Sequence, residues 1–101
     1  MTEAKMIVLY PPPVDVDAFK AEYEAHKGLV AQNMPGFSAM NLTWLTATPT
    51  GDPPRFYLLA EIVYPSMEVL RSATSTREAA AVAKDAFRIS TGGAPIFMIG
   101  E

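Results

Sequence analysis

The strongest strand signal in this chain is the run FYLLAEIVY, residues 56–64, in which Glu61 is the only charged side chain. An apolar and aromatic run of this length between turn residues is typical of a central strand. Alternate residues are apolar on both faces, with Phe56, Leu58, Ala60 and Ile62 on one side and Tyr57, Leu59 and Val63 on the other. We therefore expect a strand that is covered on both sides of its sheet.

The segment before this strand is rich in turn residues and divides the chain into two halves at residues 48–54. In the first half, Asp15 or Asp17 is expected to cap a helix that Pro35-Gly36 ends. The elements predicted there are a strand Lys5–Tyr10, a helix from Ala18 to about Asn33, and a strand Phe37–Ala47.

The second half repeats this order after the central strand. Ser66 is expected to cap a helix, and the spacing of Ser75-Thr76-Arg77-Glu78 predicts a capping box that begins a fresh helix over Ala79 to Ala86. A last strand is predicted at Pro95–Ile99. Two strand–helix–strand halves predict an α+β, ferredoxin-like βαββαβ fold in a single domain, residues 1–101, with a four-stranded antiparallel sheet and helices on one face.

Helices on one face leave the other face of the sheet uncovered. The set that includes Tyr57, Leu59 and Val63 would then form a large exposed apolar patch. The simplest cover is the sheet of a second copy, so a homodimer through sheet faces is expected. Glu61 shares this face and is expected to find a partner across the interface.

Composition excludes several classes of function. The chain has 101 residues, half of them hydrophobic, and a net charge of −3, which argues against electrostatic binding of nucleic acid. No apolar stretch approaches the roughly twenty residues of a membrane span, and the first residues resemble neither a secretory signal nor a transit peptide. The absence of cysteine excludes a thiolate metal site and favours a cytoplasmic protein; no metal is expected.

His26 is the only histidine, and helical spacing places it on one face with Phe19 and Tyr23. Imidazole exchanges protons near neutral pH, so His26 is the candidate catalytic residue, a general acid or base facing a pocket. The alternative is a core histidine that is hydrogen-bonded to a backbone carbonyl or to Glu22 one turn earlier.

The same ambiguity applies to the candidate ligand-binding residues, which are apolar or aromatic: Tyr23, Phe37, Trp44, Phe19 and Met40. They are expected either to line a pocket for a small hydrophobic ligand or to fill a small core. Gly92-Gly93 lacks the spacing of a phosphate loop, and no flavin or nicotinamide fingerprint is present, so no cofactor is expected. Haem ligation through His26 would lack a second protein ligand.

Segments along nearly the whole chain resemble, in order and spacing, the EthD family: FKAEYEAH (residues 19–26), Pro35-Gly36-Phe37, YLLAE (57–61), SMEVL (66–70), and Phe87 with Thr91-Gly92-Gly93. This resemblance implies a dimeric α/β barrel, in which two ferredoxin-like protomers pack their sheets face to face and each holds a pocket between sheet and helices. The family is named for a protein associated with bacterial breakdown of ethyl tert-butyl ether. Relatives on this fold include monooxygenases, lactone isomerases and polyketide cyclases.

The resemblance implies oxidative degradation or modification of a small aromatic or polyketide-like compound, with His26 in proton transfer. The alternative is a non-catalytic module that binds a ligand for a partner oxidase. Family members commonly carry a second histidine and a proline after the helix histidine, where this chain has Lys27 and Gly28. A mechanism that needs two adjacent imidazoles therefore does not carry over.

Overall fold

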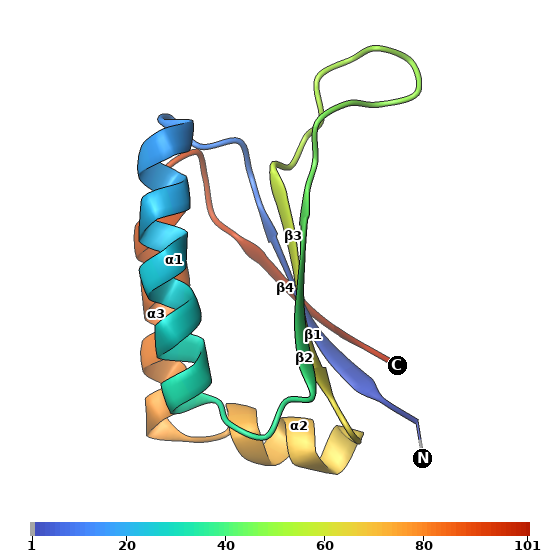
Figure 1. Ribbon diagram of the computed structural model, residues 1–101, viewed down its shortest axis with the longest axis vertical. Helices are drawn as coiled ribbons and strands as arrows, with labels where there is room; N and C mark the ends of the chain where they lie inside the picture. The colour runs from blue at the N-terminus through green and yellow to red at the C-terminus, as the bar shows by residue number, and fades with distance from the viewer. Residues whose placement is uncertain (1) are drawn as a thin grey trace.

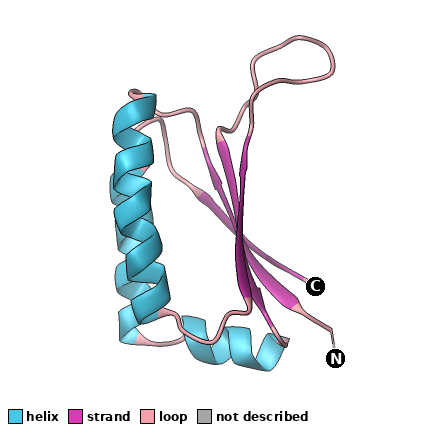
Figure 2. Ribbon diagram, viewed as in Figure 1, coloured by secondary structure: helices cyan, strands magenta, loops and turns pink. Residues whose placement is uncertain are grey.

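The computed structural model describes residues 2–101, which form four strands and three helices (Figures 1 and 2). Their bounds are β1 Ala4–Tyr10, α1 Val16–Asn33, β2 Ala39–Trp44, β3 Leu58–Tyr64, α2 Met67–Thr74, α3 Arg77–Ile89 and β4 Ile96–Gly100. The order matches the predicted βαββαβ pattern, with the second helical region in two pieces, α2 and α3.

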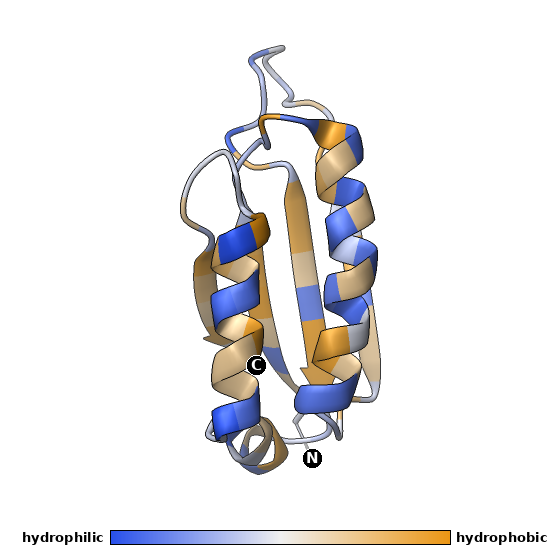
Figure 3. Ribbon diagram, turned by 90° about the vertical axis from the view of Figure 1, so that its left-hand side faces the viewer, coloured by the Kyte–Doolittle hydropathy of each residue, from blue (hydrophilic) through white to orange (hydrophobic). Residues whose placement is uncertain are grey.

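The strands form one antiparallel sheet in the order β2-β3-β1-β4, so β3, from the apolar run of residues 56–64, is a central strand. The helices lie on one face of the sheet, and the other face is uncovered (Figure 1). α1 packs against α3, and Figure 3 shows these two helices side by side in front of the sheet, with polar residues on their outward turns. The ferredoxin-like arrangement is therefore confirmed. None of the helices in this part of the chain has the length and apolar character that a membrane crossing requires.

Two clusters of buried residues lie between the helices and the sheet. One, around Tyr10, Phe19 and Leu58, lies at the end where α1 begins, and the other, around Val30 and Tyr64, lies toward α2. The Tyr64 hydroxyl donates a hydrogen bond of 2.9 Å to the carbonyl of Met34, the residue that ends α1. This buried bond ties the end of α1 to the central strand.

The uncovered face of the sheet follows from the strand register. Residues directly opposite each other point to the same face, so this face carries apolar residues from three strands: Ile7, Leu9, Leu59, Val63, Ile96 and Met98. Glu61 lies among them, and Lys5 Nζ lies 3.5 Å from its Oε2. Glu61 thus has an ionic partner within its own chain, on β1, where the sequence led us to expect one across an interface.

The helix N-caps agree with the sequence at two positions and differ at the third. Asp15 caps α1, and Ser66 caps α2. The assignment of Ser75 as the cap of the last helix is wrong, because Thr76 Oγ1 accepts the Ala79 amide at 3.0 Å. Thr76 has the extended backbone of an N-cap, φ −100° and ψ 163°, whereas Ser75 has ψ 14° and ends α2.

Some element ends also differ from the predicted ones. α3 continues past Ala86 to Ile89, which is buried and packs in the cluster with Tyr10. The second strand is shorter than the predicted Phe37–Ala47, because its pairing with β3 runs only from Ala39 opposite Val63 to Trp44 opposite Leu58. The local sequence pattern locates each helix and strand, but the residue at which it ends depends on pairing and packing with other elements.

Replacing the cap of α3 tests this assignment. We expect Thr76→Ala to lower the free energy of unfolding by about 1 kcal/mol, because the Ala79 amide loses its acceptor. Ser75→Ala is the control, and its expected effect is below about 0.5 kcal/mol. Urea unfolding measures both, and a larger loss for Ser75→Ala than for Thr76→Ala would restore the capping-box interpretation.

Candidate functional site

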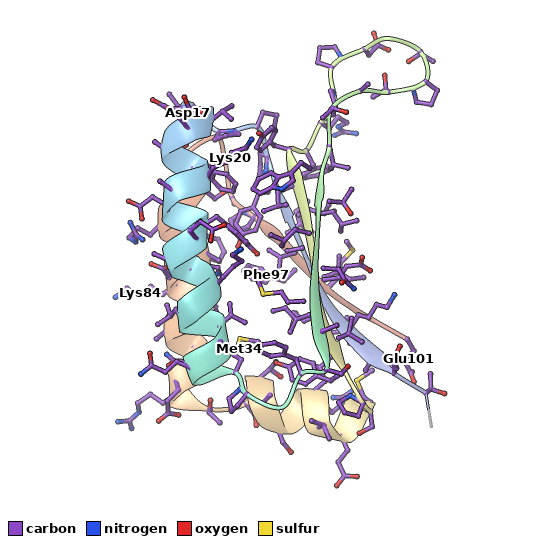
Figure 4. The ribbon with its side chains drawn as sticks, in the orientation of Figure 1. Asp17, Lys20, Met34, Lys84, Phe97 and Glu101 are labelled. Atoms are coloured by element: carbon purple, nitrogen blue, oxygen red, sulfur yellow. The ribbon has the colours of Figure 1, made fainter. Side chains whose placement is uncertain are left out.

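A cavity of about 120 Å³ lies between the helices and the sheet. Its walls are mainly apolar: Val8 and Ala60 come from the sheet, Val30 from α1, and Val82 from α3. Phe97 of the edge strand β4 also lines it, and Figure 4 shows this ring between the helices and the sheet. The cavity lies where the sequence-based resemblance placed a pocket.

His26 forms part of the cavity wall. It lies on the buried face of α1 together with Phe19, Tyr23 and Val30, as the helical spacing predicted. Its exposed fraction is 3%, and it is the only buried polar or charged residue among residues 2–101. The imidazole is thus removed from bulk water and faces open space inside the protein.

The partner of His26 is Asp85 on α3, whose Oδ2 lies 2.8 Å from Nδ1 of the ring. This replaces the partners suggested by the sequence, a backbone carbonyl or Glu22. Glu22 instead accepts from Nη2 of Arg88 at 2.9 Å, on the exposed side of the helices. Asp85 is missed by sequence reasoning, because 59 residues separate it from His26 and only helix packing brings the two together.

Asp85 is held in its ionised form. Partial desolvation raises the pKa of its carboxyl, but hydrogen bonds from His26 and Arg88 outweigh this effect, and the net pKa lies below the ordinary value. Arg88 Nε donates to Oδ1 at 2.8 Å, while Oδ2 faces His26. An ionised carboxylate only accepts, so Nδ1 carries the hydrogen, and Nε2 is left to accept or release a proton.

Two tyrosines line the cavity next to this pair. Tyr23 precedes His26 by one turn of α1, with ring centroids 5.4 Å apart, and Tyr10 of β1 packs edge-on against Tyr23 at 5.7 Å. Burial raises the pKa of both phenols, so both hydroxyls stay protonated at neutral pH. Tyr10 was not among the candidate site residues predicted from the sequence. The sequence did predict that it lies at the end of the first strand.

The remaining predicted ligand residues lie outside the cavity lining. Phe19 and Trp44 pack edge-on, 6.5 Å between centroids, in an aromatic cluster that adjoins Tyr23. Phe37 packs edge-on against Tyr64 at the other end of the core, and Met40 is partly buried against both core clusters. Of the predicted site residues, the fold therefore brings His26 and Tyr23 together at the cavity.

The residues around His26 are not arranged as a metal centre. Within residues 2–101, the His, Asp and Glu side chains form no group of three or more that could hold a metal ion. The arrangement that is present, an imidazole oriented by a carboxylate beside an apolar space, is suited to proton transfer.

The pairing of Asp85 with His26 and Arg88 predicts a pH-dependent contribution to stability. Because the folded-state pKa lies below the ordinary 3.8, the contribution is fully present above the unfolded-state pKa and is lost as pH falls through the folded-state value. We expect Asp85→Asn to lower the free energy of unfolding at pH 7 by about 1–3 kcal/mol. The difference from wild type should narrow as the pH falls below the ordinary pKa of 3.8 and the Asp85 carboxylate takes up a proton.

Urea unfolding over a pH series measures this difference. Glu3→Gln, at an exposed position, is the control for loss of one negative charge. A difference between wild type and Asp85→Asn that stays constant down to pH 2 would show that the charge of Asp85 is not what stabilises the pair.

Solved structures similar to this chain support the fold and the family. No protein-family model and no curated protein matches the sequence. A crystal structure of an ethyl tert-butyl ether D (EthD) family protein from Bacillus halodurans C-125 is 36% identical, with a TM-score of 0.86 over 99% of this chain and 98% of that one.

More distant structures show the fold alone. A dimeric ferredoxin-like protein of unknown function from Jannaschia sp. CCS1 is 12% identical, with a TM-score of 0.69 over 99% of both chains. SnoaB, a cofactor-independent oxygenase from Streptomyces nogalater, is 15% identical, with a TM-score of 0.68 over 100% of this chain and 93% of that one.

The identity and coverage shared with the Bacillus protein, together with the common βαββαβ architecture, show that this chain belongs to the EthD family.

Proposed function

We propose that the protein binds a small, mainly apolar organic compound in the cavity and that His26 moves a proton to or from it. The observation that carries this proposal is a buried imidazole in the wall of an apolar cavity, with Nδ1 held by Asp85 at 2.8 Å. A core histidine that only packs would not need an open space beside it. The ionised Asp85 compensates the positive charge that appears on the ring when it takes up a proton.

The size of the cavity narrows the ligand class. An engineered apolar cavity of about 150 Å³ binds benzene, and the cavity here is of similar size, about 120 Å³. A single six-membered ring with small substituents therefore fits the site better than a polycyclic, polyketide-like compound.

A related fold supports chemistry without a cofactor. SnoaB, which has the same architecture, is described as a cofactor-independent oxygenase. From SnoaB we infer only that side chains on this fold can act on organic molecules without a cofactor. For this chain we propose an enzyme acting through His26; if binding occurs without proton transfer, the protein is instead a ligand-binding module for a partner oxidase.

Hydrogen exchange on a ring-sized ketone separates these two roles. We expect the wild-type protein to accelerate deuterium exchange at the α-carbons of cyclohexanone in heavy water, measured by NMR. His26→Gln should slow this exchange by about 10²- to 10⁴-fold, because the proton acceptor is lost. Ala86→Leu, which places a larger side chain in the cavity wall, should also abolish it.

Two outcomes would contradict the catalytic part of the proposal. If His26→Gln leaves the rate of deuterium exchange unchanged, His26 is not the group that moves the proton. Binding of cyclohexanone by the wild-type protein without any exchange above buffer would leave the protein as a binding module.

The uncovered face of the sheet supports a homodimer as part of the same proposal. Five apolar side chains on this face are at least partly exposed, and Lys5 and Glu61 neutralise each other among them. The five are Ile7, Leu9, Leu59, Ile96 and Met98. A contiguous apolar patch of this kind marks a contact surface, and a second copy presents the same chemistry. A structure with the same fold is described as dimeric.

A charge at the centre of this face tests the dimer. Leu59 of β3 lies opposite Leu9 on this face, and we expect Leu59→Lys to convert a dimer at micromolar concentration to a monomer. Sedimentation equilibrium measures the mass, and Thr43→Lys, at the exposed edge strand β2 of the same face, is the milder control. A wild-type protein that sediments as a monomer would refute the dimer.

A further inference from the structure

We propose that the hydroxyls of Tyr10 and Tyr23 form a hydrogen-bond donor site for a ligand oxygen, next to Nε2 of His26. The inference rests on the proposed function of the cavity and narrows its ligand class. The ligand would be a compound of about one ring with a phenol, enol or ketone oxygen. Such an oxygen holds negative charge when a proton leaves the molecule.

The side chains of Tyr10 and Tyr23 are buried, and no hydrogen bond within residues 2–101 engages their hydroxyls. Tyr10 and Tyr23 are 1% and 2% exposed, and both line the cavity. Within the described chain, no side-chain oxygen or nitrogen is fully enclosed and left without a hydrogen-bond partner. The buried hydroxyl of Tyr64, for example, has a partner, because it donates a hydrogen bond to the Met34 carbonyl. Tyr10 and Tyr23 have no such bond in residues 2–101, so their hydroxyls must touch open space, and the space beside both rings is the cavity.

The state of these groups makes them donors. Burial is the main cause that raises the pKa of both phenols, and for Tyr10 the neighbouring Tyr23 phenol and Asp85 carboxylate raise the pKa further. Both groups therefore keep their hydrogens at neutral pH. A protonated hydroxyl that faces apolar walls without an acceptor lacks a hydrogen bond that it makes in bulk water. A ligand oxygen restores that bond.

The placement of the three polar groups fits one ligand. Tyr23 and His26 lie one turn apart on α1, and Tyr10 lies on β1 against Tyr23, so they share one part of the cavity wall. Val30 and Val82 provide apolar wall from α1 and α3. A ring can pack on the apolar walls while its oxygen meets the polar groups.

The arrangement predicts a balanced proton transfer. The ligand's O–H or α-carbon C–H bond breaks, the proton moves to Nε2 of His26, and the electron pair stays on the ligand as a phenolate or enolate. Tyr10 and Tyr23 donate to the resulting oxyanion, and Asp85 faces the imidazolium. One positive and one negative charge form together, so the total charge of the site does not change.

Phenol and toluene test the donor site, because they have nearly the same shape and differ in the oxygen. We would measure the affinity of both probes by NMR titration of the full chain and of its variants Tyr10→Phe and Tyr23→Phe. Each variant should weaken phenol binding by about three- to tenfold, since one hydrogen bond is lost. Toluene binding should stay within about twofold. Neither substitution removes a hydrogen bond within the protein, so both variants should fold.

Tyr57→Phe is the matched control, because Tyr57 packs against Phe19 and Trp44 outside the cavity lining. It should leave both affinities unchanged. If the wild-type protein binds toluene and the ratio of phenol to toluene affinity is the same in all variants, the donor site is refuted while the cavity keeps its role. If the wild-type protein binds neither probe, the proposed function itself fails, and the donor site with it.

Discussion

The contact between His26 and Asp85 is the interaction on which the site depends. An imidazole that is 3% exposed needs a hydrogen-bond partner, and Asp85 supplies it from the neighbouring helix at 2.8 Å. Arg88 binds the second oxygen of Asp85 and also Glu22 of α1, which extends the link to the exposed side of the two helices. The same contact thus joins α1 to α3, selects the ring nitrogen that carries hydrogen, and leaves the other one available.

The second constraint is that helices cover one face of the sheet only. Strand register places Val8, Leu58 and Ala60 toward the helices and directs Leu9 and Leu59 to the opposite face. Since α1 and α3 pack against each other above the sheet, a cavity remains between the layers instead of continuous packing. One face therefore encloses the candidate site, and the other is available for contact with a second copy.

Several features could be predicted because they depend on neighbours in sequence. Tyr23 and His26 share a face because the helical period is local, and the continuous apolar run of residues 56–64 located the central strand. Phe19 and Trp44 were expected either to line a pocket or to fill the core, and they pack in an aromatic cluster beside the cavity. Aromatic composition could not choose between the two, because a cavity wall and the core next to it use the same residue types. A charged residue such as Asp85 on a helix is ordinarily solvent-facing, so its role carried no local signal.

The order and spacing of resembling sequence segments indicated the family. Sequence alone was also sufficient for the order of elements, the ferredoxin-like architecture and the position of His26 on a buried helix face. These follow from backbone periodicity, turn residues and capping groups, which act over a few residues. The partner of His26, the cavity and the meeting of Tyr10 with Tyr23 required the folded chain. Each joins groups on different elements, and their distances are set by strand register and helix packing, which no short stretch of sequence specifies.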